Sequence, residues 1–176
     1  KMRRCGAAPH LRIFSYLRYD GFRREHTLSD EFKKFYGQAS HYDVTLQLEN
    51  EPVCNVGTIG DLAEYFRWYE KMRHLAESED EFEQRPAGEE EQYLRPLVDI
   101  ANGYAAGERP SDADIATLAP LVTAIHLKDR VLKTGRAVPF GEGDVPWADE
   151  LRRLLTRAKA PEILASIETH LSLIHI

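Results

Sequence analysis

Two carboxylates close the stretch 46–52, in which a short predicted strand runs into Glu49 and Glu51 ahead of a proline. A strand that ends in acid adds little to a core, but it can place a carboxylate where catalytic groups gather. Such a group can bind a metal ion or transfer a proton. The alternative for an isolated Glu-Asn-Glu-Pro sequence is a turn with two solvated acids, so the rest of the chain must decide.

Three further predicted strands end in a side chain that can bind a metal. These ends are Asp99 after residues 94–98, His126 near the end of residues 121–127, and Glu168 after residues 163–167. Apolar strands alternate with helical patterns, which predicts a parallel sheet covered by helices. In a barrel the carboxyl ends of such strands share one face, so these side chains are expected to converge. Two Glu, one Asp and one His suit Mn²⁺, Mg²⁺, Co²⁺ or Zn²⁺.

The remaining elements have signals of their own. Residues 11–17 predict a first strand, and Ser29 is a candidate N-cap for a helix that ends near Gly37. Later helices are predicted after Thr58, which forms a capping-box pattern with Asp61, after Ser111, and after the Asp144–Pro146 start signal. The acidic residues between 74 and 92 are interpreted as a solvated surface insertion.

Composition excludes several classes of protein. The chain has 176 residues, 43% of them hydrophobic and 30% charged, with a formal net charge of −6. That charge argues against a nucleic-acid-binding surface, and no apolar run approaches the roughly 20 residues of a membrane span. Two unpatterned cysteines, Cys5 and Cys54, favour a reducing compartment, and we therefore expect a cytoplasmic protein.

Six segments resemble, in order, those of the xylose-isomerase-like barrel superfamily, which includes sugar phosphate isomerases and epimerases and, as a distant branch, AP endonuclease family 2. They are residues 13–15, 46–52, 98–102, 126–129, 141–145 and 167–168. The resemblance implies an α/β fold, a partial (β/α)8 TIM barrel with about six of the eight strands, roughly strands 3 to 8, and outer helices. Residues 137–140 would supply the short strand 7.

The ends of the chain differ from this pattern. Residues 1–170 are expected to form one truncated barrel domain, because the segment before residue 11 is too short for the first two strand–helix units. Residues 171–176 resemble the translation of a sequencing adapter and are excluded from the site.

The resemblance also implies a site chemistry. Glu49, Asp99, His126 and Glu168 would bind one divalent cation, and Glu49 and Glu168 would be the catalytic acid–base pair on opposite sides of a sugar or sugar phosphate. Proton transfer through an enediolate then gives isomerisation or epimerisation. Asn102, Lys128 and Arg136 are candidate substrate contacts, and Glu51 and Asp129 candidate supports for the ligands. For Lys128 and Asp129, a surface ion pair is an alternative interpretation, and for Arg136 the alternative is a solvated charge. A homo-oligomer is a further expectation.

Two departures bear on the function. Many epimerases of this superfamily carry a His where this chain has Asn102, and Asn cannot relay a proton near neutral pH. Endonuclease-like members need that His and further ligands in the region of residues 138–141, which here are Val-Pro-Phe-Gly, so a three-metal DNA-repair site is disfavoured.

Two alternatives to an isomerase remain. One is a glycoside hydrolase in which Glu51 of Asn50-Glu51-Pro52 is the acid/base, although this leaves Asp99 and His126 unexplained. The other is an inactive fragment, because an open barrel leaves unpaired strand edges.

Overall fold

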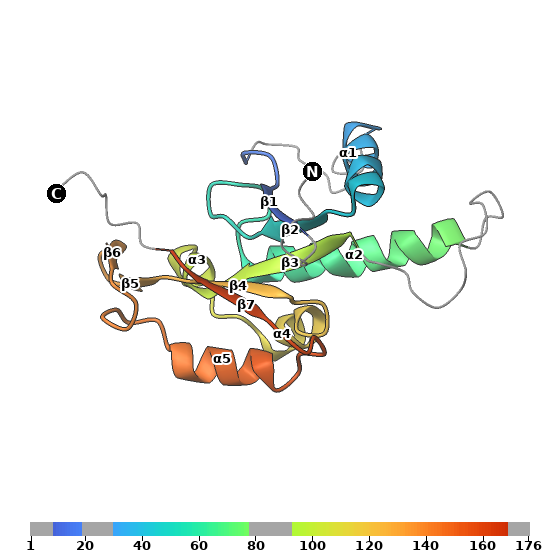
Figure 1. Cartoon of the computed structure of the whole chain (residues 1–176). Coiled ribbons are helices and arrows are strands. Elements are labelled where there is room, and N and C mark those ends of the chain that lie inside the picture. Colours follow the sequence, from blue (N-terminus) through green and yellow to red (C-terminus); the bar gives the residue numbers. More distant parts are fainter. Residues whose placement is uncertain (1–8, 19–29, 78–92, 169–176) are drawn as a thin grey trace.

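A computed structural model of the protein describes residues 9–18, 30–77 and 93–168 (Figure 1). The strands are β1 (His10–Phe14), β2 (Thr45–Glu49), β3 (Leu94–Asp99), β4 (Ala124–Leu127), β5 (Asp129–Val131), β6 (Arg136–Val138) and β7 (Leu164–Ile167). The helices are α1 (Asp30–Tyr42), α2 (Ile59–Glu77), α3 (Ile100–Ala105), α4 (Asp112–Leu118) and α5 (Trp147–Leu155).

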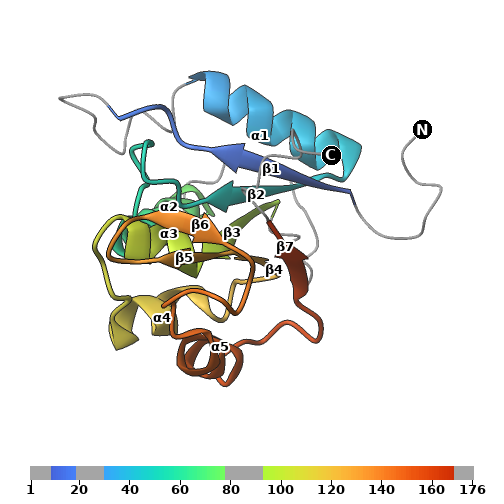
Figure 2. The ribbon, with the colours of Figure 1, turned by 90° about the vertical axis from the view of Figure 1, so that its left-hand side faces the viewer.

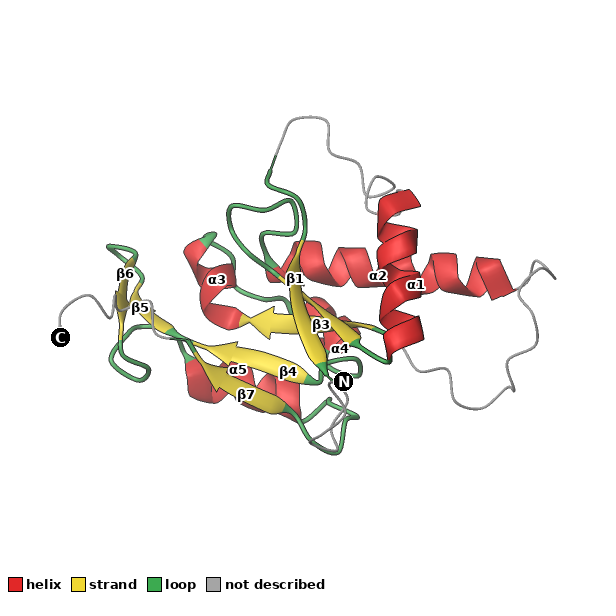
Figure 3. Cartoon of the chain, turned by 45° about the horizontal axis from the view of Figure 1, so that its top comes forward, coloured by secondary structure: helices red, strands yellow, loops and turns green. Residues whose placement is uncertain are grey.

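Five parallel strands form one curled sheet in the order β1-β2-β3-β4-β7, with β1 and β7 at its two edges (Figure 2). Helices α2, α4 and α5 lie along one face of this sheet (Figures 1 and 3). The prediction of an α/β fold with a parallel sheet and outer helices is confirmed. Because parallel strands end at the same edge, this topology brings the carboxyl ends of β2, β3, β4 and β7 together.

Alternation along the strands separates an apolar face from a polar one. In β2, Leu46 and Leu48 are buried in the hydrophobic core, while Gln47 and Glu49 point to the other, inner face. The core fills the space between the sheet and its helices. Its fully buried members include Ile59, Leu62 and Phe66 of α2, Leu94 and Val98 of β3, Ile115 and Leu118 of α4, and Leu154 of α5.

Side-chain caps begin two helices where the sequence predicted them. The Thr58 hydroxyl accepts from the backbone N–H of Asp61 at 3.0 Å, and an Asp61 carboxylate oxygen accepts from the N–H of Thr58 at 3.0 Å. This reciprocal pair is a capping box with Asp in place of Glu. The Ser111 hydroxyl accepts from the N–H of Asp114 at 3.1 Å and begins α4.

The prediction of strand 7 at residues 137–140 is wrong. Residues Arg136–Val138 form β6, which pairs antiparallel with β5 rather than joining the parallel sheet. The reason is a tight turn, in which the N–H groups of Thr134 and Gly135 both donate to the carbonyl of Val131, and Gly135 has φ +70°. Within the described residues the parallel sheet therefore has five strands instead of six.

Other boundaries also shift. Helix α1 continues past Gly37 to Tyr42, strand β1 ends at Phe14, and β4 begins only at Ala124. The short helix α3 was not predicted. Ser29, most of the acidic segment (residues 78–92) and residues 171–176 lie outside the described residues. None of the described helices is both long and apolar enough to cross a membrane.

Candidate metal centre

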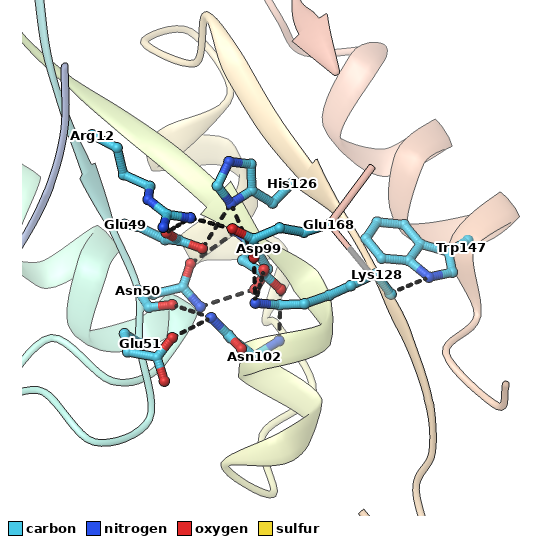
Figure 4. A network of polar contacts seen from close by, with 10 residues as sticks. All are labelled: Arg12, Glu49, Asn50, Glu51, Asp99, Asn102, His126, Lys128, Trp147 and Glu168. Carbon is cyan, nitrogen blue, oxygen red and sulfur yellow. Dashed lines mark hydrogen bonds and ion pairs between the residues drawn. The ribbon is translucent and has the colours of Figure 1, made fainter. Parts of the chain in front are cut away.

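Four side chains from four different strand ends meet at the inner face of the sheet. One ligand atom from each of Glu49, Asp99, His126 and Glu168 can be chosen so that all lie within 4.8 Å of one another. Glu49 ends β2, Asp99 ends β3, His126 lies in β4, and Glu168 directly follows β7. The first three are buried and Glu168 is partly exposed. Figure 4 shows the four side chains together. The structure thus brings together the four residues that the sequence singled out, and their role as metal ligands stays a prediction.

Strand register and a local cap fix the position of Asp99. Residue 99 pairs with His126 in the β3–β4 ladder, so the two side chains share a face. Because β3 passes directly into α3, Asp99 is also the N-cap of that helix, and its Oδ1 accepts from the N–H of Asn102 at 2.8 Å. Oδ2 is thereby turned toward the cluster, as Figure 4 shows.

Asn50 ties the end of β2 to the end of β3. Its Nδ2 donates to the carbonyl of Asp99 at 2.9 Å, and its Oδ1 accepts from the N–H of Asp99 at 2.9 Å. Both groups are buried, so these two bonds satisfy backbone atoms that water does not reach. The amide of Asn50 thus holds the ends of two ligand-bearing strands at a fixed spacing.

His126 faces two of the carboxylates. Its Nδ1 lies 2.9 Å from Oε1 of Glu49 and 3.7 Å from Oε2 of Glu168. An imidazole nitrogen directed between two carboxylates can donate a hydrogen bond to them when protonated, or bind a cation together with them when it is not.

Lys128 is a buried cation inside the cluster. Its Nζ lies 2.8 Å from Oδ2 of Asp99 and 3.1 Å from Oε2 of Glu168. Trp147 holds the Lys128 backbone in place, because its Nε1 donates to the Lys128 carbonyl at 3.1 Å. Burial acts to lower the pKa of Lys128, but the charges of Asp99 and Glu168 outweigh it and raise the pKa above its ordinary value.

Arg12 of β1 contacts two acids of the cluster. Its Nη1 donates to Oε1 of Glu168 and lies 3.4 Å from Oε2 of Glu49. The guanidinium stands over the ring of Phe14, 5.0 Å from the ring centre. Burial acts to lower the pKa of Arg12, but its hydrogen bond with Glu168 and the charge of Glu49 raise it, so this residue stays cationic.

The two cations act differently on the acids they contact. Burial raises the pKa of Asp99 to about 6, although Lys128 opposes this increase. Burial also acts to raise the pKa of Glu168, but hydrogen bonds from Arg12 and Lys128 outweigh it and lower the pKa to about 2. One acid is therefore held as a carboxylate at any ordinary pH, while the other is close to its protonation range.

The side chains fit a divalent cation. Oε2 of Glu49 is buried and makes no hydrogen bond within the described part of the chain, although Nη1 of Arg12 lies 3.4 Å away as an ion-pair partner. A buried carboxylate oxygen without a hydrogen bond is costly, and a bound cation would satisfy it. Three carboxylates and one imidazole are a donor set that divalent first-row metals and Mg²⁺ accept.

Of the other predicted site residues, two lie beside the cluster. Asn102 is buried, and its Nδ2 donates to the carbonyl of Asn50 at 2.8 Å and to Oε2 of Glu51 at 3.2 Å. Glu51 therefore contacts the amide that supports Asn50, and not the four clustered side chains directly. Both donors of the Asn102 amide already have partners. Substrate binding by Asn102 therefore stays a prediction.

Asp129 organises the loop that follows the hairpin. Its Oδ2 accepts from the N–H groups of Gly141 at 3.0 Å and Gly143 at 3.1 Å, and its Oδ1 accepts from those of Arg130 and Val145. A Cβ at residue 143 would collide with this carboxylate, which explains the glycine there. Arg136 lies exposed on β6, and the structure does not bring it into the cluster; its role in substrate binding stays a prediction.

Sequence reasoning missed three residues of the site: Arg12, Asn50 and Trp147. The alternation of side chains along the first strand could have revealed Arg12. It places Arg12 on the face opposite to the apolar Ile13. Asn50 stands between the two acids that were singled out, and no local signal distinguishes its role. The Trp147 bond to Lys128 depends on tertiary packing alone.

No protein-family model matches the chain, and no curated protein matches it in sequence. Solved structures do match in fold. The probable 3-DHS dehydratase AsbF from Bacillus anthracis aligns with a TM-score of 0.62 at 15% identity, and covers 90% of this chain and 56% of its own. A zinc-bound IolI protein aligns with a TM-score of 0.62 at 12% identity, over 92% and 54% of the two chains.

A xylose isomerase domain protein from Planctomyces limnophilus has a TM-score of 0.56 at 18% identity, over 90% of this chain and 52% of its own. The chain has the xylose-isomerase-like barrel fold. The expected resemblance is thereby confirmed at the level of the fold, and the five-stranded sheet is a partial (β/α)8 barrel. The chain spans a little over half the length of these structures.

Proposed function

We propose that the protein is a divalent-metal-dependent isomerase or epimerase of a small sugar or sugar phosphate. The observation that carries this proposal is the convergence of Glu49, Asp99, His126 and Glu168, with ligand atoms within 4.8 Å of one another. The xylose-isomerase-like fold supports it, because catalytic groups of such barrels lie at the carboxyl ends of the strands. One structural neighbour is described with a bound zinc atom.

Glu49 and Glu168 are the proposed acid–base pair. They lie on strands separated by β3 and β4 in the sheet, so their carboxylates approach the centre of the site from different directions. A carboxylate on one side of a substrate carbon can remove the proton next to a carbonyl, and the second can return it to the other face or to the neighbouring carbon. The first outcome of this transfer is epimerisation and the second is aldose–ketose isomerisation.

The remaining cluster residues set the charges and positions of this pair. Lys128 and Arg12 both contact Glu168 and keep it ionised, so its carboxylate carries no proton in the resting site. His126 holds Glu49 through Nδ1 at 2.9 Å. A divalent cation held by Glu49, Asp99, His126 and Glu168 would stabilise negative charge that develops on the substrate oxygens.

The geometry offers less support for a glycoside hydrolase. In that reading Glu51 is the acid/base, but Oε2 of Glu51 accepts a hydrogen bond from the buried amide of Asn102. A glycoside hydrolase needs a pair of carboxylates, and this contact of Glu51 is with a neutral amide and not with a second carboxylate. Asp99, His126 and Lys128 would also have no role in that mechanism.

Two measurements test the proposal on the protein and on two matched Glu→Gln variants. Calorimetric titration with Mn²⁺ should give binding at one site, and incubation of aldoses and ketoses in D₂O with Mn²⁺ should incorporate deuterium next to the carbonyl. Glu168→Gln should abolish deuterium incorporation, whereas Glu51→Gln should retain it. Absence of Mn²⁺ binding, or deuterium incorporation that survives Glu168→Gln, would exclude this function; glycoside hydrolysis that Glu51→Gln abolishes would support the alternative.

A further inference from the structure

Arg12 and Gln47 lie next to each other on the inner face of the sheet, beside the metal-binding acids. In the β1–β2 ladder, residue 12 pairs with residue 47, and Phe14 pairs with Glu49. Side chains alternate along a strand, so Gln47 points to the same face as Glu49, two residues on. Paired residues of neighbouring strands share a face as well, and Arg12 accordingly reaches Glu49. The two side chains thus border the site on its β1 side.

The side-chain amide of Gln47 is a buried donor for which the described residues supply no acceptor. The residue is 5% exposed, and its Nε2 has no hydrogen-bond partner within the described residues. A buried amide donor that lacks an acceptor is destabilising. Leu46 and Leu48 on the opposite face need only apolar neighbours. The amide N–H of Gln47, in contrast, needs a hydrogen-bond acceptor such as an oxygen atom.

Arg12 has donors that the acids do not use. Both of its ion pairs, with Glu168 and with Glu49, are made through Nη1. Nη2 and Nε make no hydrogen bond or ion pair to the part of the chain that the structure describes, and the side chain is 41% exposed. The ring of Phe14 supports the plane of the guanidinium. A planar guanidinium with two adjacent free donors matches a carboxylate or a phosphate.

The charge balance of the site points the same way. Glu49, Asp99 and Glu168 together carry three negative formal charges, whereas a divalent cation with Lys128 and Arg12 carries four positive ones. The metal-loaded site therefore has an excess of one positive charge. A neutral sugar would leave this excess uncompensated, whereas an anionic substrate would balance it.

From these contacts we propose that the substrate carries an acidic group, a carboxylate or a phosphate, which Arg12 binds with the help of the Gln47 amide. This inference rests on the proposed metal-dependent function and narrows its substrate class from sugars in general to sugar acids or sugar phosphates. Arg12 is the specificity-determining residue, because its positive charge favours an anion over a hydroxyl group, whereas the neutral Gln47 amide does not distinguish them.

The test compares three probes that share a six-carbon polyol chain: D-gluconate, D-glucitol 6-phosphate and the neutral D-glucitol. Each is titrated into protein saturated with Mn²⁺, after subtraction of its titration into Mn²⁺ alone. One anionic probe should bind at least about tenfold more tightly than D-glucitol, as expected of a charge-assisted hydrogen bond. The better of the two anions identifies the acidic group as carboxylate or phosphate.

Four variants assign the effect to residues. Arg12→Gln should remove most of the anion preference, Arg12→Lys should retain part of it, and Gln47→Leu should weaken binding of the preferred probe. Arg152→Gln, at an exposed position on α5, is the matched control and should behave like the unmodified protein. Saturable Mn²⁺ binding at one site, together with an unchanged circular-dichroism spectrum, would show that each variant has kept its fold and its metal site.

The outcomes separate the two proposals. Equal binding of all three probes by the Mn²⁺-loaded protein overturns the anionic substrate, and so does a preference that persists in Arg12→Gln or disappears in Arg152→Gln. Each of these three results leaves the metal-dependent function standing. Failure of the protein to bind Mn²⁺ in the absence of any probe overturns both.

Discussion

The Nζ atom of Lys128 lies 2.8 Å from Oδ2 of Asp99, and neither side chain is more than 3% exposed. Such a pair is well tolerated only while both partners are present, because each charge offsets the desolvation of the other. A cation of the protein therefore already neutralises part of the acidic cluster. The stability of the fold and the affinity for metal are consequently coupled through the same carboxylate.

Replacing Lys128 by Met should destabilise the protein by about 3–5 kcal/mol, because Asp99 would remain buried without its partner. Saturating Mn²⁺ should restore more stability to this variant than it adds to the unmodified protein, since the metal would supply the missing positive charge. Urea unfolding with and without Mn²⁺ measures both effects. Lys133→Met, at an exposed position in the β5–β6 turn, should change neither value. Equal stabilisation of both proteins by Mn²⁺ would argue against a shared site.

Affinity for metal should depend on pH through Asp99. Its pKa is raised to about 6, mainly by burial, and a carboxylate must lose its proton before it can bind a cation. Affinity should therefore be highest above pH 6 and fall as the pH is lowered through 6, by about tenfold for each further unit. Glu168, with a pKa of about 2, should not contribute in this range. Mn²⁺ titrations between pH 5 and 8, in buffers of equal ionic strength, would reveal the dependence, and a constant affinity would contradict it.

Acid should destabilise the fold through Glu168. Its pKa lies at about 2 in the folded protein and near the ordinary value of 4.5 when unfolded, so the unfolded chain binds the proton more tightly. The stability contributed by its contacts with Arg12 and Lys128 is complete above pH 4.5 and is lost as the pH falls toward 2. Metal-free Glu168→Gln should lack this pH-dependent part. The pKa of Asp99 is shifted in the opposite direction, so its contribution to stability depends on pH in the opposite sense. Asp99 is present in both proteins, and its contribution therefore cancels when their urea midpoints are compared. If the midpoints of the two proteins changed in parallel with pH, Glu168 would make no such contribution.

The four clustered ligands were predictable because their positions follow from local patterns. Each stands at the end of a short apolar strand, and parallel strands bring such ends together without any further information. Arg12 was not predictable in this way, since its partner Glu168 is 156 residues away and the pairing depends on how the two edge strands are placed. A different limit applies to β6, because a local turn rather than strand propensity decides which strand it joins.

Asn50 should matter more for stability than its single uncharged side chain suggests. Replacement by Ala removes two buried hydrogen bonds to the backbone of Asp99. We expect a loss of about 2–4 kcal/mol and weaker Mn²⁺ binding, because the ends of β2 and β3 would no longer be held together. Asn55→Ala, which removes bonds to the carbonyls of Tyr16 and Leu17, is the matched control and should leave Mn²⁺ binding unchanged. Equal effects of the two variants on Mn²⁺ affinity would remove the special role of Asn50.

Two glycines should respond to alanine in opposite directions. Gly37 lies inside α1 and a Cβ there would meet no atom within 4 Å, so Gly37→Ala should stabilise the protein by about 0.5–1 kcal/mol. Gly143 packs against the Asp129 carboxylate and the carbonyl of Arg130, and Gly143→Ala should be destabilising because these atoms must move. Denaturant midpoints of the two variants test both expectations. If the helix ended at Gly37, as the sequence suggested, Gly37→Ala would be neutral or destabilising. The sign of its effect on stability therefore decides whether α1 ends at Gly37 or at Tyr42.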